Sequence, residues 1–119
     1  MKRYYLALDL KDDPTLIAEY EAHHQKVSAE ILKSIRDSGI ERMELFRAGN
    51  RMFMIMEVRD GFSFEEKQKM DNANPAVQTW ENLMWHYQQA LPFAKPGEKW
   101  VLMKKIFDTN QLPGSSGNL

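Results

Sequence analysis

Residues 43–59 of the chain read MELFRAGNRMFMIMEVR. Apolar and polar side chains alternate on both sides of Ala48-Gly49-Asn50, and such alternation is typical of β-strands. Glycine and asparagine readily adopt the positive φ angles that a tight hairpin turn requires. The stretch therefore predicts two antiparallel strands, residues 43–47 and 51–59, joined by a short turn.

A strand and a helix are expected before this hairpin. Residues 3–10, RYYLALDL, alternate as a strand does. Asp12-Asp13-Pro14 then offers a helix N-cap followed by proline in the first turn. We expect one helix from there to the stop at Ser38-Gly39, the longest in the chain. Its inward stripe follows steps of three and four residues and consists of Ile17, Tyr20, His24, Val27, Ile31 and Ile35.

The segments after the hairpin complete a familiar order. Helical periodicity between residues 61 and 91 predicts a short helix over 64–70 and a main helix after Asn74-Pro75. The stripe of the main helix consists of Val77, Trp80, Met84, Tyr87 and Leu91. Residues 99–107 alternate again as a last strand. The order β-α-β-β-α-β is that of ferredoxin-like α+β folds, in which one antiparallel sheet carries the helices on one face.

The expected domain spans residues 1–108, and residues 109–119 are expected to form a flexible tail because they have almost nothing to bury. The sheet face away from the helices mixes large apolar groups with charges, such as Phe53 with Glu57. Neither a solvated face nor a dry core suits that mixture. A second copy of the sheet is the simplest cover, which predicts a homodimeric α/β barrel.

Composition excludes several classes of function. Among 119 residues, 16 basic and 17 acidic side chains give a net charge of −1, so a nucleic-acid partner is not expected. The chain has no cysteine, and histidine occurs only at positions 23, 24 and 86, so we expect no metal site. The basic start is followed by an apolar run too short for a signal peptide or a membrane span. A cytoplasmic location, without membrane contact, is the expectation.

His24 is the most informative candidate residue. It follows Tyr20 by one helical turn, so the imidazole and the phenol project to the same side. An imidazole titrates near neutral pH, which suits an acid–base group in a cleft. The alternative, that a backbone carbonyl simply satisfies a core histidine, stands equally well on these residues. His23, one position round the helix, is expected to face solvent.

Trp80-Glu81 on the main helix is the second candidate. An indole on the apolar stripe of a helix is more often part of the core. Tryptophan beside a carboxylate is nevertheless a common arrangement in sugar sites, because the indole packs on C–H groups while carboxylates bind hydroxyls.

Several motifs in a fixed order resemble one enzyme family. They are Tyr20-x-x-x-His24, Gly39 before the second strand, Gly49-Asn50-Arg51 in the hairpin, and Val77-Gln78-x-Trp80 before Leu91-Pro92. Together these residues resemble the L-rhamnose mutarotase family. The stretches RYYLALDLKDDP, RAGNRMFMIMEV, ENLMWHYQQALP and PGEKW look more like its L-fucose mutarotase branch.

The resemblance implies a homodimer that interconverts the α and β anomers of a 6-deoxy-hexose, here L-fucose, without cofactor or metal. It implies that His24 is the proton donor and that Tyr20, Trp80 and Glu81 contact the monosaccharide. Tyr20 or a sheet carboxylate, Glu44 or Glu57, would take the proton of the anomeric hydroxyl. The rhamnose type has a second tryptophan where Glu81 stands, so this pocket is expected to be more acidic.

Other functions remain open on the sequence. L-Rhamnose is the alternative substrate within the family. The same element order occurs in dimeric α/β-barrel proteins that bind haem or act as cofactor-free oxygenases. A non-catalytic ligand-binding domain is the third alternative, with His24 and Trp80 as ordinary core residues.

Overall fold

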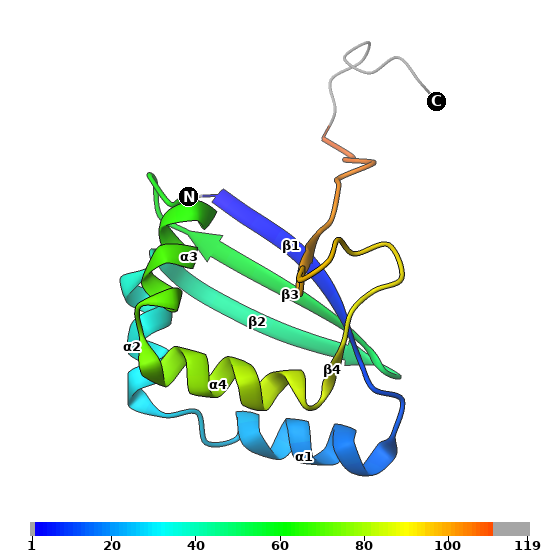
Figure 1. Ribbon diagram of the computed structural model, residues 1–119. Coiled ribbons are helices and arrows are strands. Elements are labelled where there is room, and N and C mark those ends of the chain that lie inside the picture. The colour runs from blue at the N-terminus through cyan, green and yellow to red at the C-terminus, as the bar shows by residue number, and fades with distance from the viewer. Residues whose placement is uncertain (1, 111–119) are drawn as a thin grey trace.

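The computed structural model describes residues 2–110, so most of the expected tail, residues 111–119, lies outside the described residues. The chain forms a ferredoxin-like α+β fold with four helices on an antiparallel sheet (Figure 1). Its elements are β1 (Lys2–Leu10), α1 (Pro14–His24), α2 (Ala29–Asp37), β2 (Ile40–Ala48), β3 (Arg51–Val58), α3 (Phe64–Asn72), α4 (Pro75–Trp85), β4 (Gln88–Gln89) and β5 (Val101–Leu102).

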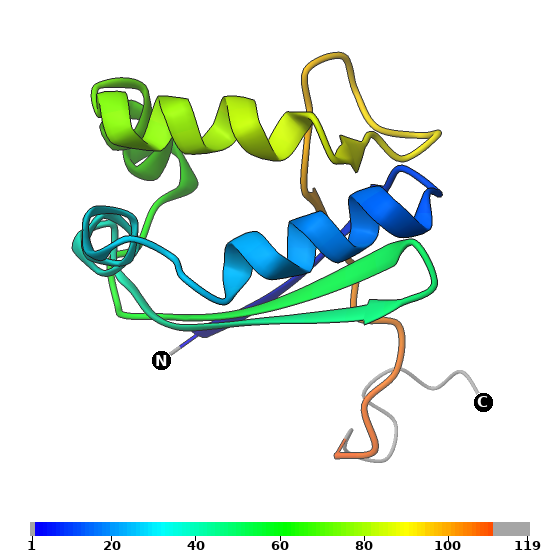
Figure 2. The same ribbon diagram turned by 90° about the horizontal axis from the view of Figure 1, so that it is seen from below.

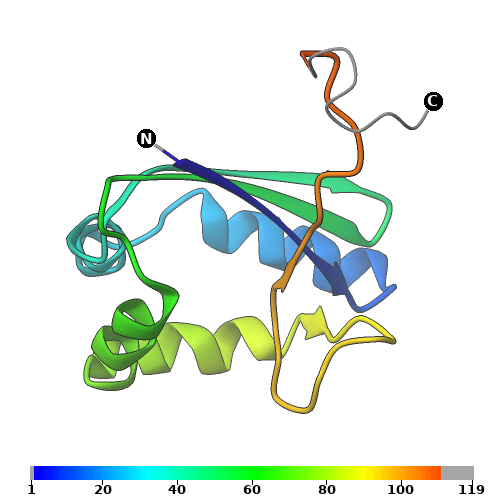
Figure 3. The ribbon, with the colours of Figure 1, turned by 90° about the horizontal axis from the view of Figure 1, so that it is seen from above.

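The sheet follows the order β2-β3-β1-β4, with β5 also paired to β1, and every pairing is antiparallel. β1 and β3 pair over eight positions, from Lys2 opposite Val58 to Asp9 opposite Arg51. The four helices lie on one side of this sheet, and no helix within residues 2–110 covers the other side (Figures 2 and 3). The expected two-layer arrangement is confirmed.

The core lies between the sheet and the helices. The buried residues of β3 alternate along the strand and are Met52, Met54, Met56 and Val58. Leu8 and Leu10 of β1 are completely buried beside them, and each contributes about 1.5–3 kcal/mol by leaving water. No helix in the described part of the chain is long and apolar enough to cross a membrane.

The long helix expected between residues 14 and 38 is wrong, because the structure has two helices there. α1 ends at His24, and residues 25–28 form a turn before α2 begins. The Ser28 side chain accepts a hydrogen bond from the Ile31 backbone N–H at 3.3 Å and so caps α2. Serine competes well as an N-cap and poorly inside a helix, so Ser28 starts a new helix.

The last strand and the end of the main helix also differ from expectation. α4 ends at Trp85, and Gln88–Gln89 leave the helical path to pair with Asp9 and Leu10 as β4. The strand expected over residues 99–107 is reduced to β5, which pairs with Leu6 and Ala7. Two short segments therefore share one edge of β1. After Met103, whose N–H bonds to Tyr5 O at 2.7 Å, the chain leaves the sheet (Figure 1).

The helix starts are confirmed. Asp13 Oδ1 accepts from the backbone N–H groups of Thr15 and Leu16 at 2.9 and 3.1 Å. Asn74 Oδ1 caps α4 in the same way, with Ala76 and Val77 as donors. A proline follows each cap, where its missing N–H costs nothing.

The Ser28 cap sets where α2 begins, so its removal should weaken the fold. Ser28→Ala is expected to lower the free energy of unfolding by about 1 kcal/mol, whereas Ser28→Asp keeps a capping oxygen and should stay close to the parent. Urea unfolding followed by circular dichroism measures both. Equal loss in the two variants would contradict the capping role.

Candidate active site

Tyr20 and His24 lie side by side on the last two turns of α1. Their ring centroids are 4.5 Å apart. Tyr20 is almost fully buried, at 4% exposure, while His24 is partly exposed. The pair therefore projects to one side of the helix, as their spacing predicts, and it combines a buried phenol with an imidazole that solvent reaches.

The His24 ring is held by the backbone of its own helix. His24 Nδ1 lies 2.9 Å from the backbone oxygen of Tyr20. A carbonyl oxygen only accepts hydrogen bonds, so Nδ1 must carry the proton. The contact fixes the tautomer of the neutral ring, in which Nδ1 carries the proton and Nε2 is left with a free lone pair.

The Tyr20 hydroxyl is neutral in this environment. Burial raises the pKa of Tyr20 to about 12, and the negative charge of Glu81 acts in the same direction. Gln88 Nε2 donates to the Tyr20 hydroxyl at 3.3 Å, and this bond opposes the shift. Near neutral pH the phenol is thus a hydrogen-bonding group rather than a base.

Trp80 and Glu81 approach this pair from α4, which runs alongside α1 on the same side of the sheet (Figures 1 and 2). The Trp80 ring lies 5.4 Å from the His24 ring in an edge-to-face arrangement. Glu81 forms an ion pair with Lys99, and the Lys99 ammonium also sits 4.7 Å from the centre of the Trp85 ring. The fold thus brings together the four candidates of α1 and α4.

A hollow of about 430 Å³ opens beside the pair, between α1 and the hairpin of β2 and β3. Its lining consists of Tyr20, Glu21, His24, Gln25, Leu45, Phe46, Arg47 and Met52. The size lies within the range of small-molecule sites. Arg47 joins the two walls, because its Nε donates to Glu21 Oε1 at 2.5 Å.

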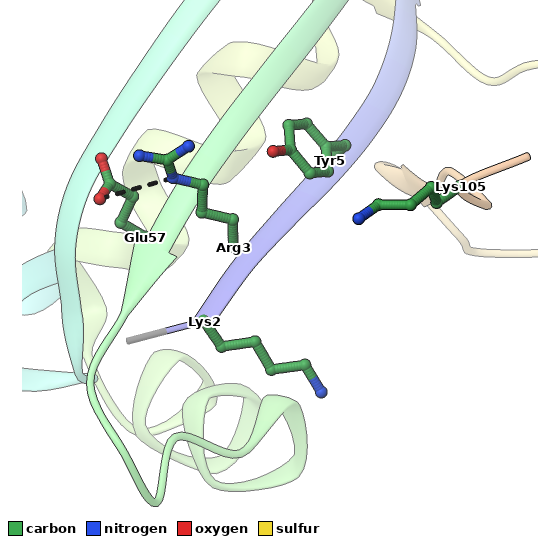
Figure 4. Close-up of a pocket in the computed structure, with 5 residues that line it drawn as sticks. All are labelled: Lys2, Arg3, Tyr5, Glu57 and Lys105. Carbon is green, nitrogen blue, oxygen red and sulfur yellow. Dashed lines mark ion pairs between the residues drawn. The ribbon is translucent and has the colours of Figure 1, made fainter. Parts of the chain in front are cut away.

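Glu44 and Glu57, expected to share the site with His24, lie on the opposite face of the sheet. β2 and β3 alternate, so these carboxylates face away from the helices when Met43 and Met56 face toward them. Glu57 pairs with Arg3 at 3.7 Å. It lines a separate hollow with Lys2, Arg3, Tyr5 and Lys105 (Figure 4).

Glu44 likewise pairs with a neighbour on its own strand, Arg42, at 3.5 Å. Within one chain the sheet separates both carboxylates from Tyr20 and His24. Contrary to what the sequence predicts, the structure therefore does not bring Glu44 and Glu57 together with the pair. Strand alternation already grouped them with Phe53 rather than with the buried Met52 row.

The structure adds residues that the sequence did not single out. Gln88, next in the chain to the buried Tyr87, contacts Tyr20. It lies within the stretch ENLMWHYQQALP, but the resemblance assigns it no role. His23, expected to face solvent, is partly buried, and its Nε2 lies 3.1 Å from the Tyr87 hydroxyl. That hydroxyl in turn donates to Glu19 at 3.1 Å, so His23 belongs to a polar network that ties α1 to the segment after α4.

Within residues 2–110, no three His, Asp or Glu side chains are grouped so that they could hold a metal ion. The polar groups that line the hollow include the His24 imidazole, the neutral Tyr20 phenol and the Glu21 carboxylate, which is paired with Arg47. The site therefore defines a ferredoxin-like domain whose side chains have the chemistry to bind a polar molecule and to exchange protons with it.

Comparison with known proteins identifies the family. Residues 3–109 match the family model described as L-rhamnose mutarotase. An L-fucose mutarotase of Xanthomonas campestris pv. campestris is 42% identical over 109 residues, which cover 90% of this chain and 87% of that protein. The chain belongs to the L-rhamnose mutarotase family.

Solved structures agree with the fold. A crystal structure of an L-rhamnose mutarotase from Formosa agariphila superposes with a TM-score of 0.67 at 16% identity, over 91% of this chain and 98% of that one. A dimeric ferredoxin-like protein from an uncultured marine organism gives 0.51 at 12% identity, over 89% and 90% of the two chains. The chain is thus a sugar mutarotase, a carbohydrate isomerase.

The raised pKa of Tyr20 links stability to alkaline pH. The unfolded chain releases this proton near pH 10.0 and the folded chain near 12. Over that window the folded state holds more protons, so the free energy of unfolding falls as pH rises, by at most about 1.4 kcal/mol per pH unit from this group.

Tyr20→Phe removes this contribution. The variant is expected to lose stability less steeply between pH 10 and 12 than the parent in urea unfolding at fixed pH. Equal slopes for the two proteins would show that Tyr20 titrates in the fold as it does in the unfolded chain.

Proposed function

We propose that this chain interconverts the α and β anomers of L-fucose by acid–base opening of the pyranose ring. The observation that carries the proposal is the His24–Tyr20 pair beside a hollow of sugar size, in a chain that is 42% identical to an L-fucose mutarotase. Glu81, with its charge balanced by Lys99, supplies an acceptor for sugar hydroxyls near Trp80.

The reaction needs two proton movements. In its protonated form His24 gives the Nε2 proton to the ring oxygen, the bond between the ring oxygen and C1 breaks, and the proton of the anomeric hydroxyl passes to water. The resulting aldehyde rotates about its bond to C2. The reverse transfers close the ring on the other face of the carbonyl, and His24 ends in the state in which it began.

The neutral Tyr20 phenol serves this reaction as a hydrogen-bonding group for the sugar. With a pKa of about 12 it is a poor acceptor for a full proton at neutral pH. Trp80 offers an apolar edge beside His24, which suits the C–H groups of the sugar. No step in this scheme calls on a cofactor or metal.

L-Rhamnose is the second candidate substrate. The matching family model and the Formosa agariphila structure both carry that sugar in their descriptions. The two sugars differ in the orientation of hydroxyl groups, so the contacts of Glu81 and its neighbours would decide between them.

His24→Ala should slow anomer exchange by about a hundredfold or more, since acid–base help of this kind contributes roughly 10²–10⁴-fold. Saturation transfer between the two anomeric protons in NMR measures the exchange for L-fucose and L-rhamnose. The exposed His86 provides the matched control, and His86→Ala should keep the parent rate.

The proposal fails if the parent protein exchanges neither sugar faster than buffer does. A His24→Ala variant that folds and keeps the parent rate would move the acid–base role to another group.

We further propose that a second copy of the chain covers the open face of the sheet. That face carries a row of three aromatic side chains. The ring centroid of Phe53 lies 6.0 Å from that of Tyr5 and 6.2 Å from that of Phe46. Phe46 is 48% exposed. Bidentate bonds from Arg51 to Asp9, at 2.8 and 3.1 Å, add paired charges to the same face. A symmetric copy would bury the aromatic row, and one structural neighbour is itself described as dimeric.

Phe53→Glu places a charge at the centre of this row and should raise the dimer dissociation constant at least about a hundredfold. Phe93→Glu is the control, because Phe93 is 72% exposed in the loop after β4. Sedimentation velocity reports both masses. A monomeric parent protein, or a Phe53→Glu variant that stays dimeric, would contradict this interface.

A further inference from the structure

Gln88 is a buried polar side chain that contacts Tyr20 and that the reaction scheme does not use. It lies on β4 and is 4% exposed. Its Nε2 donates to the Tyr20 hydroxyl at 3.3 Å. Its Oε1 is buried and has no hydrogen-bond partner among the described residues.

Such an arrangement is costly for a purely structural residue. A buried acceptor left unpaired loses its hydrogen bonds to water without replacement, and nearly all buried polar atoms in proteins have a partner. An apolar side chain of similar volume would pack there without that cost. A side chain retained with one end unpaired points to a ligand that brings a donor.

The paired end of the amide determines how Tyr20 can act. A hydroxyl has one hydrogen to donate, and its oxygen accepts. Because the Tyr20 oxygen accepts from Gln88, the hydrogen of Tyr20 is directed away from the amide and is available to another acceptor. Tyr20 also lines the hollow beside His24.

We propose that Gln88 is a positioning and binding residue for the sugar. Its N–H group turns the Tyr20 hydroxyl so that Tyr20 donates to one sugar oxygen, and its free oxygen accepts the hydrogen of a neighbouring sugar hydroxyl. A donor and an acceptor side by side fit a ligand with two adjacent hydroxyl groups. This inference rests on the mutarotase function proposed above.

The proposal assigns both contacts to sugar groups other than the ring oxygen that receives the proton. Such contacts stabilise the bound sugar and the transition state equally. Loss of such uniform binding raises KM and leaves kcat nearly unchanged. A merely structural role would instead lower the active fraction, and with it the apparent kcat at an unchanged KM.

The test is saturation-transfer NMR of L-fucose and L-rhamnose exchange at increasing sugar concentration. Gln88→Met keeps the side-chain volume and removes both polar ends. We expect its KM to rise about tenfold or more, the effect of two lost hydrogen bonds, with kcat within about threefold of the parent. Gln89→Met, at the exposed next position of β4, is the matched control and should match the parent.

A double-mutant cycle then tests whether Gln88 acts through Tyr20. In the Tyr20→Phe background, Gln88→Met should raise KM clearly less than it does in the parent, because the shared hydrogen bond is already gone. Equal effects in both backgrounds would overturn the positioning role.

NMR of the parent protein tests the inference without any variant, and so it also applies if Gln88→Met does not fold. In the parent protein labelled with nitrogen-15, the side-chain amide signals of Gln88 should shift when the sugar is added, and those of Gln89 should stay in place. Unmoved Gln88 signals at saturating sugar, or a parent-like KM in Gln88→Met, would reject the inference alone. A parent protein without exchange activity on either sugar would reject the proposed function and this inference with it.

Discussion

One hydrogen bond, from His24 Nδ1 to the backbone oxygen of Tyr20, constrains the site more than any other contact. It fixes which ring nitrogen carries the constant proton and leaves Nε2 for exchange. Because donor and acceptor belong to consecutive turns of α1, the constraint is local and does not depend on a distant loop. The His24 ring, to which we assign the acid–base role, is therefore oriented as soon as this helix forms.

The fold places α1 so that this orientation is useful. Asp13 caps the start of the helix, and the turn before Ser28 ends it just after His24. The helix is thus only 11 residues long, with His24 in its last turn. The hollow lies between α1 and the strands β2 and β3. Trp80 of α4 contacts the His24 ring from another side. Burial keeps the neighbouring phenol neutral, so the site combines the His24 imidazole with a phenol that serves as a hydrogen-bonding partner.

Patterns that are local in the chain predicted most of the fold. The hairpin, the capped starts of α1 and α4, and the Tyr20–His24 pair all follow from spacings of a few residues. The helix break at Ser28 was missed because the apolar stripe continues through it, from His24 to Ile31. The pattern does not predict β4 and predicts the last strand too long, because β4 and β5 form only where they pair with the edge of β1.

In the site, too, contacts within a few residues of the chain could be predicted and contacts between distant segments could not. Gln88 reaches Tyr20 from 68 positions away, and no local pattern carries such a contact. Strand alternation places Glu44 and Glu57 on one common face, but the side occupied by the helices is a property of the whole domain. The family motifs, by contrast, are spread in order along the chain, which is why a resemblance could be drawn from them.

The most direct test of the central claim is the tautomeric state of His24, read from the long-range proton–nitrogen NMR spectrum of its ring in the neutral form. The account predicts a proton on Nδ1 and none on Nε2, and a change in the Nε2 signal when L-fucose is added. A proton on Nε2 of neutral His24 would contradict the account. So would an Nε2 signal that does not change when the protein is exchanging the anomers of the added sugar.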